Sequence, residues 1–367
     1  MPPLQHFKLA RKNLLQRQDK INLPQRQGQI LQRLFEKVLV TGGAGYCGSR
    51  LVPQLLSRGY KVTVYDVMFF GDYFLPKNNP NLKVVKGDIR DTKHFAETVK
   101  EHDAVVNLAC ISNDASFELD EQLSTSVNLD AFEPMVIAAK KAGVKRFIYA
   151  SSSSVYGVSD KPNVTEDHPL LPLTLYNKFK GMCEPLLKKH TDDNFTGVIF
   201  RPATVCGYAP RQRFDLSVNI LTNHAVNANK ITVFGGSQLR PNLHVQDYCD
   251  AVELFLTAPS EKIQNETFNV GTQNLSLMQI AELVRDVVSK EFPEKGRVEI
   301  ATTPSDDLRS YHINSDKIKR VLGFVPKHSI EDAVHDLCQA FRDGRVPNSM
   351  EDDKYFNVRW LKRHKAA

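Results

Sequence analysis

The chain has 367 residues, of which 41% are hydrophobic and 25% are charged, and its formal net charge at pH 7 is +6. This length and composition are typical of a globular protein with one large or two modest domains. No hydrophobic run approaches the roughly 20 residues of a membrane-spanning helix, so we expect no association with a membrane.

The positive charge lies at the two ends of the chain. Residues 1–36 hold seven basic and two acidic side chains, and residues 354–367 hold five basic and no acidic ones, which leaves −4 for the middle. We expect a basic extension at 1–36 and a solvated basic tail at 351–367 on a mildly acidic body, which argues against nucleic-acid binding. The Gln- and Arg-rich residues 1–36 also fit a mitochondrial transit peptide or short helices docked on the body.

Six cysteines are scattered along the chain, without a C-x-x-C pair or the histidine spacing of a zinc site. Most of them stand in hydrophobic stretches, as the reduced core residues of a cytoplasmic protein do. We therefore expect neither a disulfide nor a metal site.

The first predicted strand, Val38–Val40, is followed at once by a glycine-rich turn and by a helical pattern that ends at Ser57. Strand, glycine turn and helix start are the context that a dinucleotide-binding fingerprint requires. Glycines let the backbone approach a pyrophosphate, and the helix N-terminus offers that anion free N–H groups. The spacing fits G-x-G-x-x-G and also a second pattern of glycines, at Gly42, Gly45 and Gly48. Such turns also occur for packing reasons, so the assignment depends on the residues that follow.

Strand-like and helical segments alternate from residue 37 to residue 200. Helical periodicity fills the intervals between the strands, for example over Phe132–Ala142. Repeated βα units predict an α/β fold with a Rossmann-type, doubly wound parallel sheet and a dinucleotide-binding domain at 37–200. The further strands are expected at Lys61–Asp66, Leu82–Asp88, Ala104–Ala109, Arg146–Ser151 and Phe195–Phe200.

After Arg201 the pattern becomes less regular. Short strand-like segments are mixed with helical ones, which predicts a smaller substrate-binding domain at 201–350, interleaved with late elements of the sheet. The strands are expected at Ile231–Phe234 and Thr267–Val270, and the helices at Asp250–Thr257 and Leu277–Ser289.

Asp66 ends the second strand, about 20 residues after the glycine turn, where the fingerprint places an acid. A carboxylate there accepts hydrogen bonds from the ribose hydroxyls of NAD and repels the 2′-phosphate of NADP. The next residues, Val67–Phe70, offer no Lys or Arg to hold that phosphate. The sequence therefore predicts NAD, and the alternative is an aspartate that only caps the following turn.

Two further segments are expected at the cofactor. Asp88 and Ile89 would contact the adenine, unless they form an ordinary turn before a helix capped by Asp91. The end of the fourth strand, Leu108–Ala109, would bring backbone close to the cofactor. The predicted cofactor-binding residues are Gly42, Gly45, Tyr46, Cys47, Gly48, Asp66, Asp88, Ile89, Leu108, Ala109, Tyr176 and Lys180.

Tyr176 and Lys180 stand four residues apart, on one face of a predicted helix, and follow the serine-rich run Ser151–Ser154. A phenol has a pKa near 10 and is a poor base at neutral pH. A neighbouring ammonium and a positive nicotinamide ring favour the phenolate, so they lower that pKa. A serine hydroxyl can hold the substrate hydroxyl whose proton the phenolate takes. The alternative is a packed Tyr beside a solvated Lys.

With these motifs in place, residues 37–345 resemble the extended short-chain dehydrogenase/reductases, in the branch of nucleotide-sugar epimerases and dehydratases. The resemblance implies that Tyr176 is the acid/base, that Lys180 binds the nicotinamide ribose and that Ser152 orients the sugar. It also implies a homodimer and places Arg240 at the substrate diphosphate, unless that Arg only pairs with Asp247. The matching motifs are Thr41–Gly48, Asp66, Gly87–Ile89, Ser152, Tyr176 with Lys180, Leu239–Asp247, Asn269–Gly271 and Ser315–Lys319.

Three departures bear on the reaction. The sugar dehydratases of the branch carry an Asp-Glu pair where this chain has Ser153 and Ser154, and the decarboxylases carry a Glu at the position of Ser154. The UDP-galactose epimerases carry an Asn at the position of Ala203. They also have an Arg that contacts a phosphate before the Pro-x-Asp turn, where Thr303 stands here. Arg211, Arg213 or Arg309 could make this phosphate contact instead. The predicted substrate-binding residues are Ser152, Ser153, Arg213, Arg240 and Arg309.

The sequence thus predicts an NAD-dependent nucleotide-sugar epimerase that works through a transient keto sugar. One alternative is an NAD(P)-dependent reductase of 4-keto-sugar nucleotides with the same catalytic residues. The alternative from another class is a non-catalytic NAD-binding scaffold, which the intact Ser152, Tyr176 and Lys180 disfavour.

Overall fold

The computed structural model describes residues 34–159, 161–305 and 310–364, all of which belong to one compact unit, Arg33–Ala367. Residues 1–33 of the predicted extension and Arg309 lie outside the described residues. In the part of the chain that is described, no helix is long and hydrophobic enough to cross a membrane.

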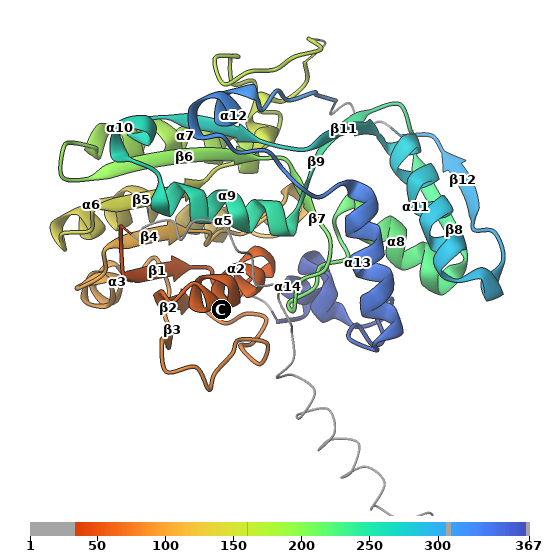
Figure 1. The fold of residues 1–367 in the computed structure, drawn as a ribbon, viewed down its shortest axis with the longest axis horizontal. Helices are drawn as coiled ribbons and strands as arrows, with labels where there is room; N and C mark the ends of the chain where they lie inside the picture. The colour runs from red at the N-terminus through yellow and green to blue at the C-terminus, as the bar shows by residue number, and fades with distance from the viewer. Residues whose placement is uncertain (1–33, 160, 306–309, 365–367) are drawn as a thin grey trace, which may run out of the picture. The chain divides into compact units, whose positions relative to one another are not determined.

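Six strands between residues 37 and 202, together with β10 from later in the chain, form one parallel sheet of seven strands (Figure 1). Its order is β10-β6-β5-β4-β1-β2-β3, so the direction of winding reverses between β1 and β4. The predicted Rossmann-type α/β fold is therefore confirmed, and every strand expected before residue 200 is present. The strands are β1 (Lys37–Thr41), β2 (Lys61–Asp66), β3 (Leu82–Lys86), β4 (Ala104–Asn107), β5 (Arg146–Ala150), β6 (Thr196–Pro202) and β10 (Thr267–Val270).

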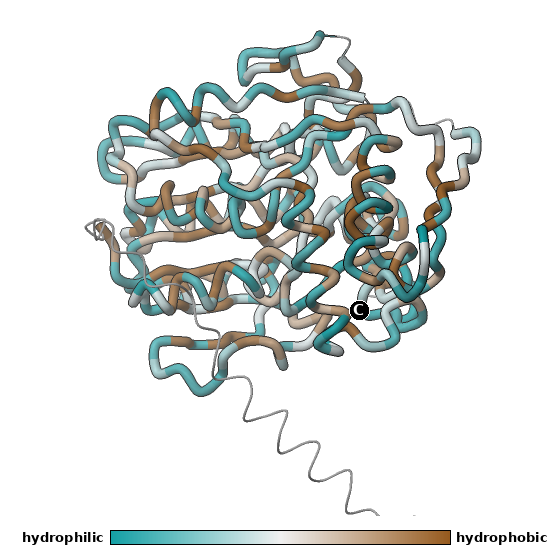
Figure 2. The backbone as a smooth tube through the Cα atoms, turned by 45° about the vertical axis from the view of Figure 1, so that its right-hand side comes forward, coloured by the Kyte–Doolittle hydropathy of each residue, from teal (hydrophilic) through white to brown (hydrophobic). Residues whose placement is uncertain are grey.

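Side chains along each strand alternate between two hydrophobic layers, one on each face of the sheet. In β1, Val38 and Val40 belong to the layer that includes α2 and α9, whereas Leu39 belongs to the layer with α3, α6 and α7. Each buried Val or Leu side chain contributes about 1.5–3 kcal/mol. Figure 2 shows hydrophobic segments along the central strands and helices. The helices are α2 (Tyr46–Ser57), α3 (Thr92–Val99), α6 (Phe132–Lys141), α7 (Leu175–His190) and α9 (Val245–Thr257).

The chain leaves the large sheet after β6 and returns to it with β10. Between and after these strands, three helices pack around one further hydrophobic cluster, next to the two-stranded sheet β12-β8 (Figure 1, right). A three-stranded sheet has the order β11-β9-β7. The elements are β7 (Thr204–Cys206), α8 (Ser217–Ala228), β8 (Lys230–Phe234), β9 (Leu239–His244), β11 (Gln273–Ser276), α11 (Leu277–Glu291), β12 (Glu299–Thr303), α12 (Asp316–Leu322) and α13 (Ile330–Arg342).

The later strands and helices expected from the sequence lie within β8, β10, α9 and α11. Two of these late helices begin with reciprocal side-chain caps, Ser276 with Gln279 in α11 and Ser329 with Asp332 in α13. The division into domains at residue 200 stays a prediction. The remaining short elements are α4 (Asp114–Phe117), α5 (Glu121–Thr125), a π-helical turn (Ser126–Asp130), α10 (Ser260–Ile263) and 3₁₀ turns at Ser153–Tyr156, Pro293–Lys295 and Asp353–Tyr355.

The C-terminal segment is a docked helix rather than the solvated tail expected at 351–367. In α14 (Asn357–His364), the Trp360 indole donates a hydrogen bond to the Phe69 carbonyl oxygen (2.7 Å), and its ring centroid lies 5.9 Å from that of Phe70. Asn357 is buried, whereas the Arg363 side chain is 72% exposed. The prediction is wrong here because net charge does not reveal that the basic residues share an amphipathic helix with a buried face.

Candidate active site

The carboxyl ends of β1, β2, β4 and β5 open on one cavity of about 580 Å³. Ligands of open α/β sheets bind at this edge. Motifs that are far apart in the sequence therefore converge on one site. Fifteen of the predicted residues line the cavity: Gly42, Gly45, Tyr46, Cys47, Asp66, Asp88, Ile89, Leu108, Ala109, Ser152, Ser153, Tyr176, Lys180, Arg213 and Arg240.

The glycine turn lies against the end of β4. Gly42 has φ +70°, and a Cβ atom on it would lie 2.6 Å from the Ala109 backbone nitrogen. Gly48 is the exception among the predicted cofactor glycines, because it does not line the cavity. A Cβ atom on Gly48 would lie 2.5 Å from the Gly43 carbonyl oxygen, so this glycine lets α2 start tightly against the turn.

Asp66 stands at the end of β2, beside this turn. One carboxylate oxygen accepts a hydrogen bond from the Ala44 backbone N–H (3.0 Å) and the other from the Met68 N–H (2.8 Å). Burial raises the pKa of Asp66, and these two N–H groups partly offset the effect. A carboxylate has about four acceptor sites, so two remain for the hydroxyls of a ribose. The glycine turn and Asp66 thus fit a dinucleotide, while Asp66 also caps its own turn.

Asp88 and Ile89 line the cavity after β3. The Asp88 carboxylate forms an ion pair with Arg90 (2.5 Å), and Asp91 caps α3 by accepting from the His94 N–H. The cap agrees with the turn expected as the alternative, and the contact with adenine stays a prediction. Arg90, which sequence reasoning did not select, also lines the cavity.

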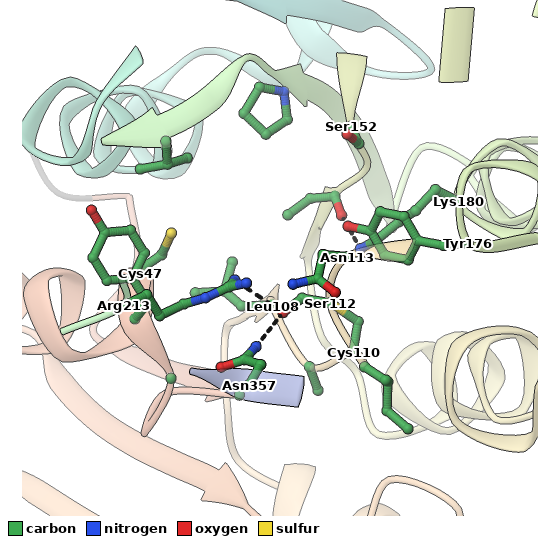
Figure 3. A pocket seen from close by; sticks show the side chains of 18 of the residues that line it. Cys47, Leu108, Cys110, Ser112, Asn113, Ser152, Tyr176, Lys180, Arg213 and Asn357 are labelled. Atoms are coloured by element: carbon green, nitrogen blue, oxygen red, sulfur yellow. Dashed lines mark hydrogen bonds between the residues drawn. The ribbon is translucent and has the colours of Figure 1, made fainter. Parts of the chain in front are cut away.

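Ser152, Tyr176 and Lys180 come together from the end of β5 and the first two turns of α7. Figure 3 shows Tyr176 and Lys180 on one side of the pocket, facing Arg213 on the other. Lys180 is 5% exposed and donates its ammonium to the Ala150 carbonyl oxygen (2.8 Å). The solvated Lys expected as the alternative is therefore wrong.

Burial raises the pKa of Tyr176 well above its ordinary value, and the nearby Cys110 and Asp114 act in the same direction. Arg213 acts in the opposite direction. Tyr176 is therefore a neutral phenol at neutral pH in the free chain. Additional positive charge in the cavity would favour its phenolate form.

The serine run is connected to α7 by hydrogen bonds. The hydroxyls of Ser152 and Ser154 lie 2.7 Å apart, and Ser154 donates to the side-chain oxygen of Asn177. Ser153 is buried, and its hydroxyl has no partner among the described residues. This arrangement leaves two hydroxyl groups, and no carboxylic acid, at the positions directly after Ser152.

The wall opposite Tyr176 is built from the loop after β7. Arg213 forms an ion pair with Asp215 (2.8 Å) and donates to the Ser112 hydroxyl (3.1 Å). Asn357 of α14 donates to the same hydroxyl (3.0 Å), as the dashed lines in Figure 3 mark. Arg213 is thus held toward the cavity by groups from three segments of the chain.

Arg240 of β9 lines the cavity, as predicted for a substrate contact. The alternative partner, Asp247, is instead bound to His328 and to the backbone N–H groups of Lys327 and His328. Arg240 donates one hydrogen bond to its neighbouring Leu239 carbonyl oxygen (3.0 Å).

All six cysteines are unpaired, as predicted, and four are buried. The other two, Cys47 and Cys110, line the cavity. Burial raises the pKa of the Cys47 thiol to about 12, so this side chain is a neutral part of the wall.

Sequence reasoning did not select several residues that line the cavity. Asn177 follows Tyr176 directly and could have been found from its place in the motif. Asn357 and Leu361 had only a weak signal, the aromatic residues between the basic ones near the C-terminus. The missed residues that bear on the arguments below are Ser112, Asp114, Asn177, Asp215 and Asn357.

Known proteins resemble this chain in sequence and in fold. A sequence model of the NAD-dependent epimerase/dehydratase family matches residues 38–271. A UDP-glucose 4-epimerase of Lactobacillus helveticus is 29% identical over 319 residues, which cover 81% of this chain and 94% of that protein. A dTDP-glucose 4,6-dehydratase of Streptomyces niveus is 28% identical over 330 residues, which cover 84% of this chain and 94% of that protein.

Among solved structures, MoeE5 in complex with UDP-glucuronic acid and NAD superimposes with a TM-score of 0.71 at 26% identity. The match covers 84% of this chain and 99% of that one. The family match over residues 38–271 and these relatives together show that the chain is an NAD-dependent enzyme of the extended short-chain dehydrogenase/reductase type. The chain belongs to the NAD-dependent epimerase/dehydratase family.

Proposed function

We propose that the chain is an NAD-dependent nucleotide-sugar epimerase. Its relatives include both epimerases and dehydratases, so the choice depends on the residues of the site. The observation that carries the proposal is that Ser152, Tyr176 and Lys180 line one cavity in which Ser152 is followed by two serines rather than by acids.

In this proposal Tyr176 moves the proton. As phenolate, its Oη takes the proton of a sugar hydroxyl while the hydrogen on the same carbon leaves as hydride, which gives a keto sugar. NAD, when bound in the cavity, would supply the acceptor and the donor of that hydride. When the hydride returns to the other face of the carbon, Tyr176 gives the proton back. The sugar is inverted at that carbon, and no net oxidation or reduction occurs.

Lys180 and Ser152 support this proton transfer. The Lys180 ammonium lies in the same cavity, and its positive charge favours the phenolate form of Tyr176. The Ser152 hydroxyl can donate to or accept from the reacting sugar hydroxyl. Its present partners are the Ser154 hydroxyl (2.7 Å) and the Ser154 backbone N–H, from which it accepts (3.2 Å).

The serines at 153 and 154 favour epimerisation over loss of water. Dehydration needs an acid that protonates the departing hydroxyl group, and a serine hydroxyl is not acidic enough at neutral pH. Ser154 is in addition bound to Asn177. Glu184, the acid of α7 nearest to these serines in sequence, is buried and forms an ion pair with Arg201 (2.6 Å).

The proposal is tested with the purified full-length chain, NAD, and a panel of UDP-, GDP-, CDP- and dTDP-sugars followed by NMR. We expect one sugar to yield its epimer with no net change in NADH absorbance at 340 nm. Stoichiometric consumption of added NADH with a keto sugar would instead identify a reductase. A 4-keto-6-deoxy product would identify a dehydratase, and bound NAD without any turnover would identify a scaffold.

A further inference from the structure

Two buried arginines of the loop after β7 line the cavity with donors that have no partner. Arg211 is 4% exposed and Arg213 is 7% exposed. Among the described residues, neither Nε of Arg211 nor one terminal nitrogen of Arg213 has a hydrogen-bond partner. Buried guanidinium N–H groups are costly to leave unsatisfied, so unused donors at a cavity wall indicate a missing acceptor.

The two arginines differ in how their charge is balanced. Asp215 forms an ion pair with Arg213, whereas no carboxylate of the described residues forms one with Arg211. Burial and the neighbouring Arg213 lower the pKa of Arg211 to about 9, so the group is still charged at neutral pH. Asp215, Tyr73 and Asp66 act in the opposite direction without forming an ion pair with Arg211. The wall therefore carries one buried positive charge in excess, and an anionic ligand would compensate it.

The position of Arg211 relates it to the glycine turn. Its backbone N–H donates to the hydroxyl of Ser49 in the first turn of α2 (3.1 Å). Its guanidinium lies 3.5 Å from the centroid of the Phe70 ring, in the segment after Asp66. Both neighbours flank the place where the fingerprint binds a pyrophosphate, so Arg211 lies beside that place.

Helix α14 completes this wall. The Asn357 side-chain oxygen accepts from a terminal nitrogen of Arg211 (2.6 Å), and its side-chain nitrogen donates to Ser112, which also binds Arg213. The Asn357 backbone N–H donates to Asp215 (2.9 Å). One residue of the last helix thus fixes the directions of both guanidinium groups. The donors without a partner among the described residues are then Nε of Arg211 and one terminal nitrogen of Arg213, and these can bind a ligand.

We propose that Arg211 and Arg213, oriented by Asn357 of α14, form a clamp for a diphosphate on the wall opposite Tyr176, beside the glycine turn. Planar guanidinium groups suit the oxygens of phosphate, and two of them can bind both phosphates of a diphosphate. Both the dinucleotide cofactor and a nucleotide sugar carry this group. The nucleotide-sugar case rests on the proposed function, whereas the cofactor case does not.

The test is calorimetric titration of the full-length chain, which measures binding and not turnover. In the first arm, NAD is titrated into cofactor-free protein, and adenosine, which lacks the diphosphate, is titrated as the control ligand. In the second arm, UDP is titrated into NAD-saturated protein. A charge-assisted hydrogen bond corresponds to a loss of about 10- to 100-fold in affinity. We expect Arg211→Gln to cause this loss in one of the two arms and to leave adenosine binding unchanged. Asn357→Ala should cause a smaller loss, about 2- to 10-fold, in the same arm.

Arg363→Gln is the matched control, since it removes a charge from the exposed side of α14 and should change neither arm. Loss in the NAD arm assigns the clamp to the cofactor, and loss in the UDP arm assigns it to the nucleotide sugar. Unchanged affinity in both arms would overturn the proposal. Equal losses for NAD, UDP and adenosine would also overturn it, because they would indicate a role in folding. Absence of epimerase activity would affect neither titration, so the two proposals fail separately.

Discussion

Burial and the positive charge of Arg213 act on the pKa of Tyr176 in opposite directions. Burial raises the pKa of the phenol, so the free chain holds a neutral side chain at this position. In the proposed reaction, the Lys180 ammonium and the positive nicotinamide ring of bound NAD would both favour the phenolate. We therefore expect Tyr176 to act as a base only when NAD is bound.

Replacing Tyr176 by Phe removes this hydroxyl and keeps the ring that packs in the cavity. We expect turnover to fall at least about 10²- to 10⁴-fold, the usual contribution of a general base. NAD affinity, measured by calorimetry, should stay within about threefold, since a single neutral hydrogen bond contributes little to binding. Retained turnover, or loss of NAD binding, would contradict the assigned role.

Residues in short motifs could be predicted from the sequence, and residues joined by the fold could not. Tyr176 and Lys180 lie one helical turn apart, and Asp66 ends a strand at a fixed distance from the glycine turn. Asn357 donates a hydrogen bond to Ser112, which lies 245 positions earlier in the sequence, and this contact places it at the cavity. No local pattern encodes such a contact, because it depends on how separate segments pack.

At the scale of elements, α7 connects stability to the site, since it carries Tyr176, Asn177 and Lys180. Its N-cap is Thr174, whose hydroxyl accepts from the Asn177 backbone N–H (3.3 Å). The same hydroxyl donates to the carboxylate of Asp114 in α4 (2.6 Å). This single side chain thus fixes both the start of α7 and its position relative to the cavity wall.

Thr174→Ala should lower the free energy of unfolding by about 0.5–2 kcal/mol, the usual cost of losing an N-cap. Urea denaturation followed by far-ultraviolet circular dichroism measures the change. Thr174→Ser keeps the hydroxyl and serves as the control, with stability close to the unchanged chain. Equal stability of the Ala and Ser variants would show that the cap contributes nothing.

The strands of the large sheet could be predicted because each is a short segment rich in β-branched and aromatic hydrophobic residues that ends in a turn. The sheet β11-β9-β7 could not, since β9 contains Arg240, Pro241 and Asn242 and has no regular alternation. Helix α14 has only eight residues, and its buried face becomes apparent only where Trp360 meets Phe69 and Phe70. Tertiary contacts, rather than local propensity, decide these elements.

At the scale of the whole molecule, Asp247 connects the large sheet to the later part of the chain. It lies in α9, which packs on the sheet, and its carboxylate accepts from the backbone N–H groups of Lys327 and His328, shortly before α13. The His328 ring nitrogen lies 3.0 Å from the same carboxylate. The His328 ring also stacks on His244, with centroids 4.7 Å apart.

The ion pair of Asp247 and His328 predicts a range of pH in which it contributes most to the free energy of unfolding. The hydrogen bond with Asp247 raises the pKa of His328, against burial and together with the more distant Asp250 and Asp332. Burial acts to raise the pKa of Asp247, but His328 and the two N–H groups lower it overall. The stabilisation from His328 is present below its unfolded pKa and is lost as pH rises through the raised folded pKa. That from Asp247 is present above its unfolded pKa and is lost as pH falls through the lowered folded pKa.

Both contributions are therefore complete between about pH 4 and pH 6.5, the two unfolded pKa values. Asp247→Asn should destabilise the chain most in this window and less on either side of it. Denaturation of both proteins at a series of pH values measures the difference. A difference that does not vary with pH would show that the carboxylate acts only as a hydrogen-bond acceptor.

The hydrogen bond between Ser112 and Asn357 can form only after the last part of the chain has been synthesised. The ribosome makes Ser112, Arg211 and Arg213 before Asn357, and N-terminal segments begin to fold first. The strands of the large sheet can thus pair while the wall of the cavity still lacks α14. A chain that stops before residue 357 still contains every strand that the structure describes, together with Ser152, Tyr176 and Lys180. It lacks the hydrogen bonds of Asn357 with Arg211, Asp215 and Ser112.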